Sequence, residues 1–417
     1  MKKIPIMIML SLLAGVSAIA QETRNDEELF QGDDLVTGAE TGNKDTGSYH
    51  LLVTEEAVIG GKITLTHQTS LDAEELDDPA NQLDLLCMLF LDAPDEDEPN
   101  ESSQLTQLTE LFSDFNINAL VYVRAGKQNV TWGTGYYFSP ADIINLQTID
   151  PEDPSADREG PLAVKFHLPA GTTNFYLYLI LDEIVNDRIT VAPKIEFVLG
   201  GTEFGLGGYY RQNSAIAGMA TISSSLGDVG LFAEAMAMAG SSKTFIRETD
   251  DLVTYPLGLR PYTQPDTVFF SATTGFNYSY LDDFDNFNLS FQGQYYYNGT
   301  GYDDLEIFSR NAIAVGMLAG SGVLDKTDMA SRGMHYAAAG IQLMELFQTD
   351  FSLGVFWIMN LQDLSGTLSC SLQFTPNDYV TITVGIRQVY GDDRDEYAPQ
   401  GDSLGYYFKT SIGTGKF

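Results

Sequence analysis

The sequence predicts an all-β fold: one transmembrane antiparallel β-barrel of about sixteen strands. Sixteen segments alternate apolar and polar residues, which is the pattern of a strand with one apolar and one polar face. Their number is even and most are near ten residues long, as a tilted membrane strand requires. The connections between them alternate between short and long, which is typical of barrels with short periplasmic turns and long extracellular loops.

The N-terminus predicts an export signal. Lys2 and Lys3 precede the apolar stretch 4–16, and the small-residue triplet 18–20 follows it. This order is that of a cleaved secretory signal peptide over 1–20. Residues 21–57 are polar and acidic, and we expect them to form a periplasmic or inserted segment before a barrel over 58–417.

The alternation is clearest at 268–280, where Val268 and Phe270 begin the apolar phase and Ser271 and Thr273 lie in the polar phase. Clusters of tyrosine and phenylalanine at the strand ends are typical of the two membrane interfaces. The sixteen expected strands are 59–69, 83–92, 117–127, 161–169, 173–181, 187–199, 203–211, 215–224, 228–238, 268–280, 285–298, 334–346, 350–361, 365–374, 378–390 and 404–416.

The connections test the barrel prediction independently. Four long ones, 128–160, 239–267, 299–333 and 391–403, all follow odd-numbered segments, whereas many that follow even-numbered segments are only two or three residues long. This sorting places both termini on the periplasmic side. The stretch 93–116 breaks the rule, because it is too long for a periplasmic turn, and we expect a short helix near 104–112.

A soluble β-sandwich also alternates and is the main alternative fold. Its outer faces would carry scattered charges, whereas the apolar faces here are nearly free of them, with Lys127 at a strand end as the exception. This difference favours a barrel in lipid. The two cysteines, Cys87 and Cys370, fall in the apolar phases of strands 2 and 14, so no disulfide is expected between them.

Basic residues gather in the polar phase of the strands, which faces the lumen. Strands 15, 16 and 1 become neighbours when the barrel closes, so these residues would line one wall of a water-filled pore and select permeants by charge. The alternative is that each cation pairs with a nearby acid and holds the strands in register. The candidate pore-lining residues are Lys62, Arg124, Lys165, His167, Arg188, Lys194, Arg211, Arg387 and Lys409.

The connection 128–160 is the candidate constriction loop. Ser139 and Pro140 read as the start of a short helix, with Ser139 as its N-cap. The apolar residues after them favour packing, either inside the barrel mouth, where the loop would narrow the pore, or on the outer rim. The candidate constriction residues are Trp132, Pro140, Asp142 and Asn145.

The stretch from Arg124 to Arg158 resembles porin-like and alginate-export-like outer-membrane barrels of Gram-negative bacteria. There a strand ends in Arg-x-Gly-Arg-Gln and continues into Trp-Gly, Pro-x-Asp and Asn; here Lys127 replaces the second arginine. The resemblance covers about forty residues. The terminal Phe417 is similar to the closing aromatic residue that the barrel assembly machinery reads in this family. The resemblance implies a channel-type barrel among outer-membrane lipids.

Other function classes find little support. The 58 acidic against 22 basic residues argue against a nucleic-acid partner. The four histidines show neither metal-ligand spacing nor a nucleophile motif, so no enzyme, metal or cofactor is expected. We expect passive diffusion of small hydrophilic solutes through the outer membrane. A non-conducting surface or structural barrel, adhesin-like, is the alternative, and a channel for hydrophobic substrates fits the polar lining poorly. A homo-oligomer is left open.

Overall fold

The computed structural model describes residues 65–72, 111–117, 120–146, 149–152, 154, 158–181, 190–211, 216–282, 286–377 and 380–412. The expected signal peptide, the acidic segment 21–57, the expected strand 83–92 with Cys87, and Phe417 lie outside these residues.

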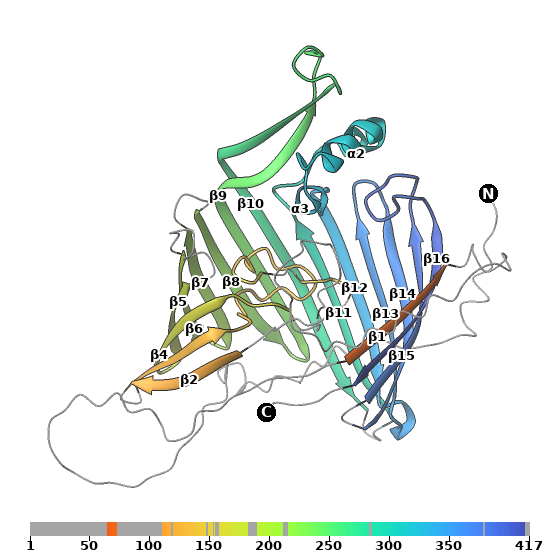
Figure 1. Cartoon of the computed structure of the whole chain (residues 1–417). Coiled ribbons are helices and arrows are strands. Elements are labelled where there is room, and N and C mark those ends of the chain that lie inside the picture. Colours follow the sequence, from red (N-terminus) through yellow and green to blue (C-terminus); the bar gives the residue numbers. More distant parts are fainter. Residues whose placement is uncertain are drawn as a thin grey trace, which may run out of the picture.

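Sixteen antiparallel strands form one sheet, as predicted (Figure 1). From β2 to β16 each strand pairs with the next one along the chain, and β1 pairs with β16 in the register Leu65 to Ile412. The strands are β1 (Leu65–Asp72), β2 (Leu111–Ile117), β3 (Val121–Lys127), β4 (Leu162–Ala170), β5 (Thr173–Ile180), β6 (Thr190–Leu199), β7 (Thr202–Arg211), β8 (Ile216–Leu226), β9 (Val229–Glu248), β10 (Leu259–Leu281), β11 (Asn288–Tyr297), β12 (His335–Met344), β13 (Phe351–Asn360), β14 (Gly366–Asn377), β15 (Val380–Tyr390) and β16 (Ser403–Ile412).

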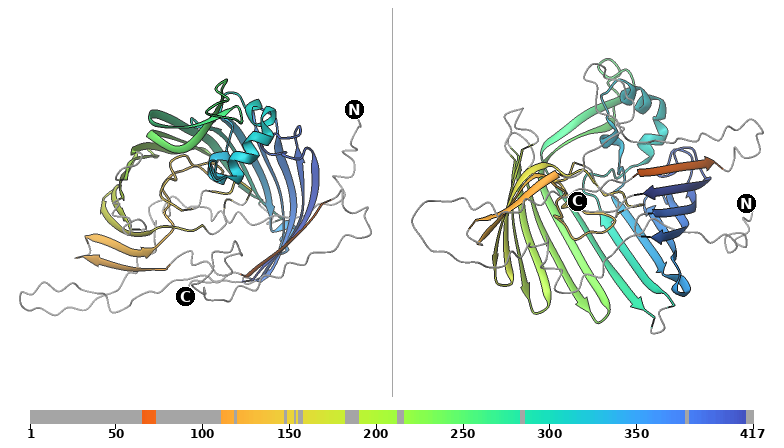
Figure 2. Two further views of the ribbon diagram at one scale, coloured as in Figure 1. Left: turned by 45° about the horizontal axis from the view of Figure 1, so that its top comes forward. Right: turned by 60° about the horizontal axis from the view of Figure 1, so that its bottom comes forward.

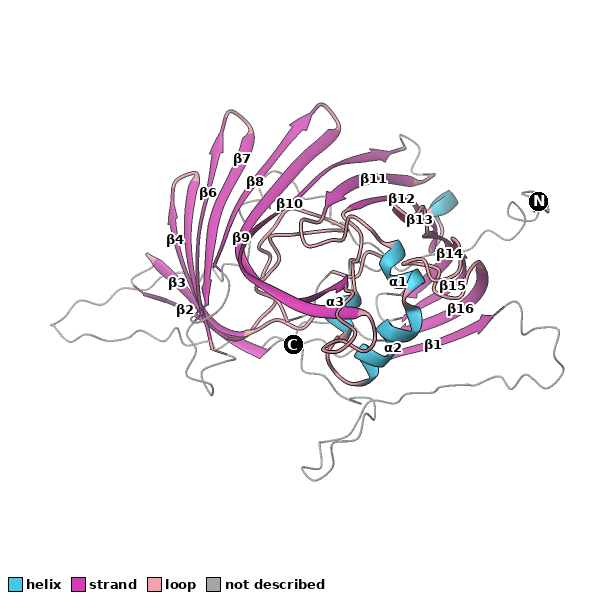
Figure 3. Ribbon diagram, turned by 90° about the horizontal axis from the view of Figure 1, so that it is seen from above, coloured by secondary structure: helices cyan, strands magenta, loops and turns pink. Residues whose placement is uncertain are grey.

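The sheet curves around an interior, as the view from above shows (Figure 3). The strand order begins at β1 and ends at β2. In the described part of the chain no pairing joins these two strands, and the residues between them, 73–110, lie outside it. The predicted adjacency of strands 15, 16 and 1 is confirmed.

The two faces of the sheet follow the predicted phases. On β10, Ser271 and Thr273 are each 3% exposed and face the interior, whereas Val268 and Phe270 are more than half exposed on the outside. On β14, Ser371 and Gln373 face inward in the same way. The outward face is therefore a broad exposed apolar surface, which is the arrangement of a sheet solvated by lipid rather than by water.

The connections alternate in length as predicted. At one end, here called the turn end, β4–β5 and β6–β7 are joined by two residues each, with Gly171 and Gly201 in the left-handed conformation that these tight turns need. At the other end, here called the loop end, the connections are mostly longer.

The prediction for 93–116 was wrong at its C-terminal end. Residues 111–117 form β2, which pairs with β3 across a connection of three residues, so Leu111 and Phe112 belong to a strand and not to a helix. The reason is cross-strand pairing: Asp114 lies opposite Arg124 and binds it, while Leu111 and Ile117 face outward. The short connection also restores the alternation of connection lengths that 93–116 had broken.

The expected loop 239–267 was also largely wrong. β9 and β10 continue beyond the rest of the sheet as a two-stranded ribbon, with register shifts between Tyr262 and Gln264 and again before Val268. The ribbon is stabilised by packing, because Ile246 and Leu259 are buried against helices from the next long connection. These helices are α1 (Glu306–Arg310), α2 (Ala312–Gly320) and α3 (Lys326–Met329); a 3-10 turn covers Leu346–Gln348.

We call the ribbon and these helices the cap. Its apolar cluster also contains Ile307, Phe308 and Leu318. Hydrogen bonds also stabilise the cap: the amide of Thr244 donates to Asp328 Oδ1 at 2.7 Å, and Lys243 Nζ donates to the carbonyl of Thr300. No helix among the described residues is both long and apolar enough to cross a membrane.

Candidate functional site: the loop inside the sheet

The connection between β3 and β4 folds into the interior of the sheet. Figure 2 shows it in the space that the strands enclose, which is one of the two placements that the sequence left open for 128–160. Side chains from strands on opposite sides of the interior bind its backbone. The loop therefore lies inside the curved sheet and not on its outer rim.

Glu234 on β9 is the main anchor of the loop. Its side chain faces inward and is 2% exposed. Its Oε2 accepts hydrogen bonds from the amides of Thr134 and Gly135, and its Oε1 accepts from the Ala141 amide and the Ser139 hydroxyl, at 2.7–3.0 Å. Four donors on one buried carboxylate compensate its desolvation and fix the loop relative to β9.

Gln294 on β11 is the second anchor. Its Oε1 accepts from the amides of Tyr136 and Tyr137, at 3.1 and 2.7 Å. Its Nε2 donates to the Phe138 carbonyl and to the Thr273 hydroxyl of β10. The amide side chain thus substitutes for a neighbouring strand along three loop residues, using both its donor and its acceptor.

The expected helix at Ser139 is absent. Ser139 to Asp142 form a single turn, closed by a 3.0 Å bond from the Asp142 amide to the Ser139 carbonyl. Ser139 does not cap this turn through its own hydroxyl, because that hydroxyl donates to Glu234. Glu234, on the wall of the sheet, supplies the carboxylate that binds the free amides of this turn. The helix-start signal therefore correctly indicated free amides that need an acceptor, but these amides belong to a single turn and not to a helix.

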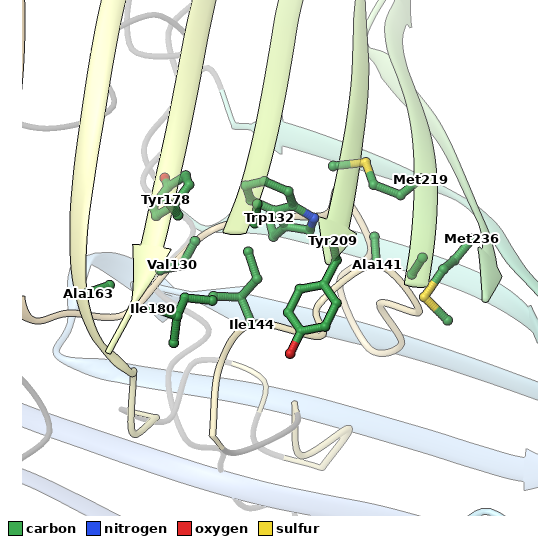
Figure 4. Packing of buried hydrophobic residues seen from close by; sticks show 12 residues of the cluster. Val130, Trp132, Ala141, Ile144, Ala163, Tyr178, Ile180, Tyr209, Met219 and Met236 are labelled. Atoms are coloured by element: carbon green, nitrogen blue, oxygen red, sulfur yellow. The ribbon is translucent and has the colours of Figure 1, made fainter. Parts of the chain in front are cut away.

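One side of the loop packs against β4–β9. Trp132, 1% exposed, meets Tyr178 edge to face at 5.3 Å, and Ile144 lies in the same cluster with Met219 and Met236 (Figure 4). Lys194 on β6 donates to the Trp132 carbonyl at 2.9 Å. The contact between the loop and this wall therefore combines an apolar cluster with buried charged side chains that bind the loop backbone.

The other side of the loop packs against β11–β13. Phe138 stacks on Tyr296 at 5.1 Å, and Tyr137, 1% exposed, contacts Phe356. Tyr336 also contacts Phe138. A cavity of about 30 Å³ remains between the loop and this wall, and apolar residues such as Val355 and Phe356 line it together with the polar Gln342.

The remaining predicted constriction residues brace the loop itself. Asn145 exchanges bonds with the backbone of Val130, at 2.9 and 2.7 Å, and donates to Asp142 Oδ1 at 2.6 Å. Asp142 also pairs with Arg158. Burial raises the pKa of the Asp142 carboxyl, and the Arg158 guanidinium acts against that rise. Pro140 is buried in the turn from Ser139 to Asp142.

A third tether crosses to β15. Glu152 of the loop binds Arg387 through two hydrogen bonds, at 2.7 and 2.6 Å, and accepts a further one from Thr367 on β14. Such a bidentate pair fixes orientation as well as distance. The loop therefore contacts the interior from β6 around to β15.

The predicted basic residues are mostly paired with acids or aromatic rings. Arg124 binds Asp114 through two bonds and lies 3.8 Å over the Phe112 ring. Lys194 lies 2.5 Å from Glu196. Arg387 has Glu152 as its partner. At these three positions the geometry is therefore that of the alternative in which each cation pairs with a nearby acid.

The other basic positions in the described part lie mostly beside aromatic rings. Lys165 lies 5.5 Å over the ring of Tyr176, and His167 stacks on that ring and bonds Asn174. Arg211 lies 5.7 Å over Tyr209. Lys409 is half-buried on β16. Lys62 and Arg188 lie outside the described residues. No group of acidic, histidine or cysteine side chains there could hold a metal ion.

Sequence reasoning did not identify the anchors. None of Glu234, Gln294 and Glu152 is among the predicted site residues. One signal existed for Glu234: it is the only acid in an otherwise small and apolar run, 233–240, of a strand. A lone carboxylate in such a run must find partners from elsewhere in the chain.

Comparison with known proteins gives distant structural similarity only. No family model matches the chain, and no curated protein matches its sequence. Solved structures similar to it include OccAB1 of Acinetobacter baumannii, with 10% identity, 74% of this chain and 76% of that chain covered, and a TM-score of 0.40. OccK1 of Pseudomonas aeruginosa is 8% identical, with 74% of this chain and 79% of that chain covered and a TM-score of 0.40. OmpT of Vibrio cholerae, an outer membrane protein, is 8% identical, with 74% of this chain and 80% of that chain covered and a TM-score of 0.35. Scores this low assign no family, so the fold rests on the strand pairing described above.

Proposed function

We propose that this chain is an outer-membrane channel through which small hydrophilic solutes diffuse passively, constricted by the loop 128–160. The observation that carries the proposal is the loop itself, anchored across a polar interior by Glu234 and Gln294. The apolar outward face fits a sheet surrounded by outer-membrane lipids, and the inward serine, threonine and glutamine side chains fit a hydrated lumen. No enzymatic activity is part of this proposal.

The charged groups of the interior would set selectivity in this channel. The predicted pore-lining cations, among them Arg124 and Arg387, come with acidic partners. We expect a lumen that carries both signs of charge, with a transverse field, and not a uniformly basic wall. Solutes would pass the loop where these pairs are partly exposed.

A non-conducting structural barrel is the second candidate, because the loop packs against walls on both sides of the interior. Those contacts leave less open lumen than a loop on one wall would. The two candidates differ in one measurable property, which is ionic current.

The deciding experiment is planar-bilayer recording with the folded full-length protein and its Glu234→Ala variant. A channel gives discrete conductance steps, and the variant, with its main anchor removed, gives larger and noisier ones. Glu345→Gln is the matched control, since it removes an exposed carboxylate at the turn end without touching the loop. Silence from folded wild-type protein, with current only in the Glu234→Ala variant, would favour the closed barrel.

A further inference from the structure

Helix α2 lies at the loop end of the molecule (Figures 1 and 3). It carries a stripe of exposed apolar residues. Ile313 is 83% exposed and Met317 56% exposed. Gly316 and Gly320 lie on the same stripe, at the spacing of one helix face, and face open space. The opposite face, with Leu318, is buried in the cap.

This stripe is unusual for a helix in water. The run 311–324 contains no charged residue, so α2 is apolar on every side. A helix of that kind is normally buried all round. Contiguous exposed apolar residues on an ordered helix mark an interaction surface rather than ordinary surface.

The charges beside α2 are mostly negative. Arg310, just before the helix, is surrounded by three carboxylates: Asp304 at 2.6 Å, Glu306 at 2.9 Å and Glu248 at 3.4 Å. Glu248 also accepts a 2.8 Å bond from Asn311, which places it at the first turn of α2. The hydrogen bond from Arg310 lowers the pKa of Asp304, so this carboxyl is ionised at neutral pH. Two further guanidinium groups lie beside α1: Arg394 donates to the Ser309 carbonyl, and Arg332 lies over the Phe308 ring. Arg394 comes from the stretch 392–396, which also carries four acidic residues, so negative charge remains in excess at this end of the stripe.

This charge discriminates between the occupants that an apolar stripe could have. A second copy of the chain would bring the same acids against these acids, and the chain as a whole carries a net charge of -36. An anionic lipid surface would be repelled for the same reason. A partner with an apolar side and a basic flank satisfies both features.

We propose that the α2 stripe is a docking site for a cationic amphipathic helix. Its apolar side would cover Ile313 and Met317, with Gly316 and Gly320 allowing close approach of the two backbones. Its lysine or arginine residues would meet Glu248 and Glu306. The site requires only that the loop end be exposed, so it does not depend on whether the barrel conducts.

The test is binding of a fluorescent synthetic peptide of leucine and lysine, patterned as an amphipathic helix, to the full chain in zwitterionic nanodiscs. Anisotropy above that with empty nanodiscs reports binding. We expect Ile313→Ser with Met317→Ser to weaken binding about tenfold. Gly316→Leu, which faces open space, should fold normally and weaken binding by blocking close approach. Val253→Ser changes a 94% exposed residue away from the stripe and should have no effect.

Salt should weaken the complex, and a peptide with glutamate in place of lysine should not bind. Equal binding of both peptides, or wild-type affinity in the stripe variants, would overturn the proposal. A dimer of the wild-type chain that Ile313→Ser with Met317→Ser abolishes would overturn it too, because the occupant would then be a second copy.

Discussion

The Glu234 carboxylate on β9 accepts a 2.7 Å hydrogen bond from the amide of Ala141, 93 positions away along the chain. The bond is one of four that the loop donates to this side chain. A single inward acid on the wall thus determines where the middle of the loop lies.

Replacing this acid without changing its shape should destabilise the fold. Glu234→Gln turns one acceptor into a donor that faces the loop amides, so buried donors lose their partner. We expect the free energy of unfolding to fall by about 1–3 kcal/mol. Denaturant unfolding of the micelle-bound protein measures this, with Glu345→Gln as the charge-matched control. Equal unfolding midpoints for the two variants would show that the Glu234 bonds contribute nothing net.

Gly133 should be as sensitive as Glu234. A Cβ at this position would lie 2.3 Å from Glu234 Oε2 and 2.1 Å from the Ser139 hydroxyl. Gly133→Ala must therefore displace the anchor. We expect the free energy of unfolding to fall about as much as it does in Glu234→Gln. In the double variant the fall should be smaller than the sum of the two single falls, because both substitutions remove the same interaction. Fully additive losses would contradict this coupling.

The Arg387–Glu152 pair should control the sign of ion selectivity. Arg387→Gln leaves the Glu152 carboxylate without its partner and should shift the reversal potential toward cation preference. Glu152→Gln leaves the guanidinium and should shift it toward anions. The double variant should return near the wild-type value, since both charges are gone. Reversal potentials under a salt gradient provide the measurement, and shifts of the same sign in both single variants would refute the assignment.

Glu396, in the connection between β15 and β16, should make the loop end sensitive to pH. Its carboxylate accepts bonds from the amides of Arg332 and Gly333, from the Tyr336 hydroxyl and from Asn360. Burial raises its pKa above 4.5. The folded chain then binds a proton more readily than the unfolded chain. The contribution of this group to stability is full below pH 4.5 and is lost as pH rises through the folded-state pKa.

Glu396→Gln removes this titration. Relative to that variant, the wild-type protein should lose free energy of unfolding as pH increases from 4.5 through the folded-state pKa. Denaturation midpoints of both proteins across that range provide the test. Parallel profiles would mean that Glu396 has the same pKa in the folded and unfolded chains.

The sheet was predictable because its information is local. Alternation at 268–280 identified both the strand and its inward face, and connection lengths gave the orientation of every strand. The cap was not predictable in this way. Its ribbon is stabilised by contacts of Ile246 and Leu259 with helices far along the chain, and alternation does not report such packing.

The loop shows the same limit at the site. The apolar residues after Asp142 predicted that the loop packs against the barrel, but they did not decide between its interior and its outer rim. The anchors of the loop could not be predicted, because Glu234 and Gln294 lie on strands about 100 and 150 positions away. The residues around each of them in the sequence do not indicate which segment they bind. The turn at Ser139 was mistaken for a helix for the same reason: the carboxylate that binds its amides comes from another element.

The pairing of β1 with β16 has a consequence for assembly. Every other pairing joins strands that follow each other along the chain and can form as the chain is delivered. β1 instead finds its described partner only when the last strand arrives, so it must be kept from aggregating throughout synthesis and export. Chains that stop before Ser403 lack β16 and leave β1 without its described partner, and such truncations should be cleared by proteases far more readily than their length suggests.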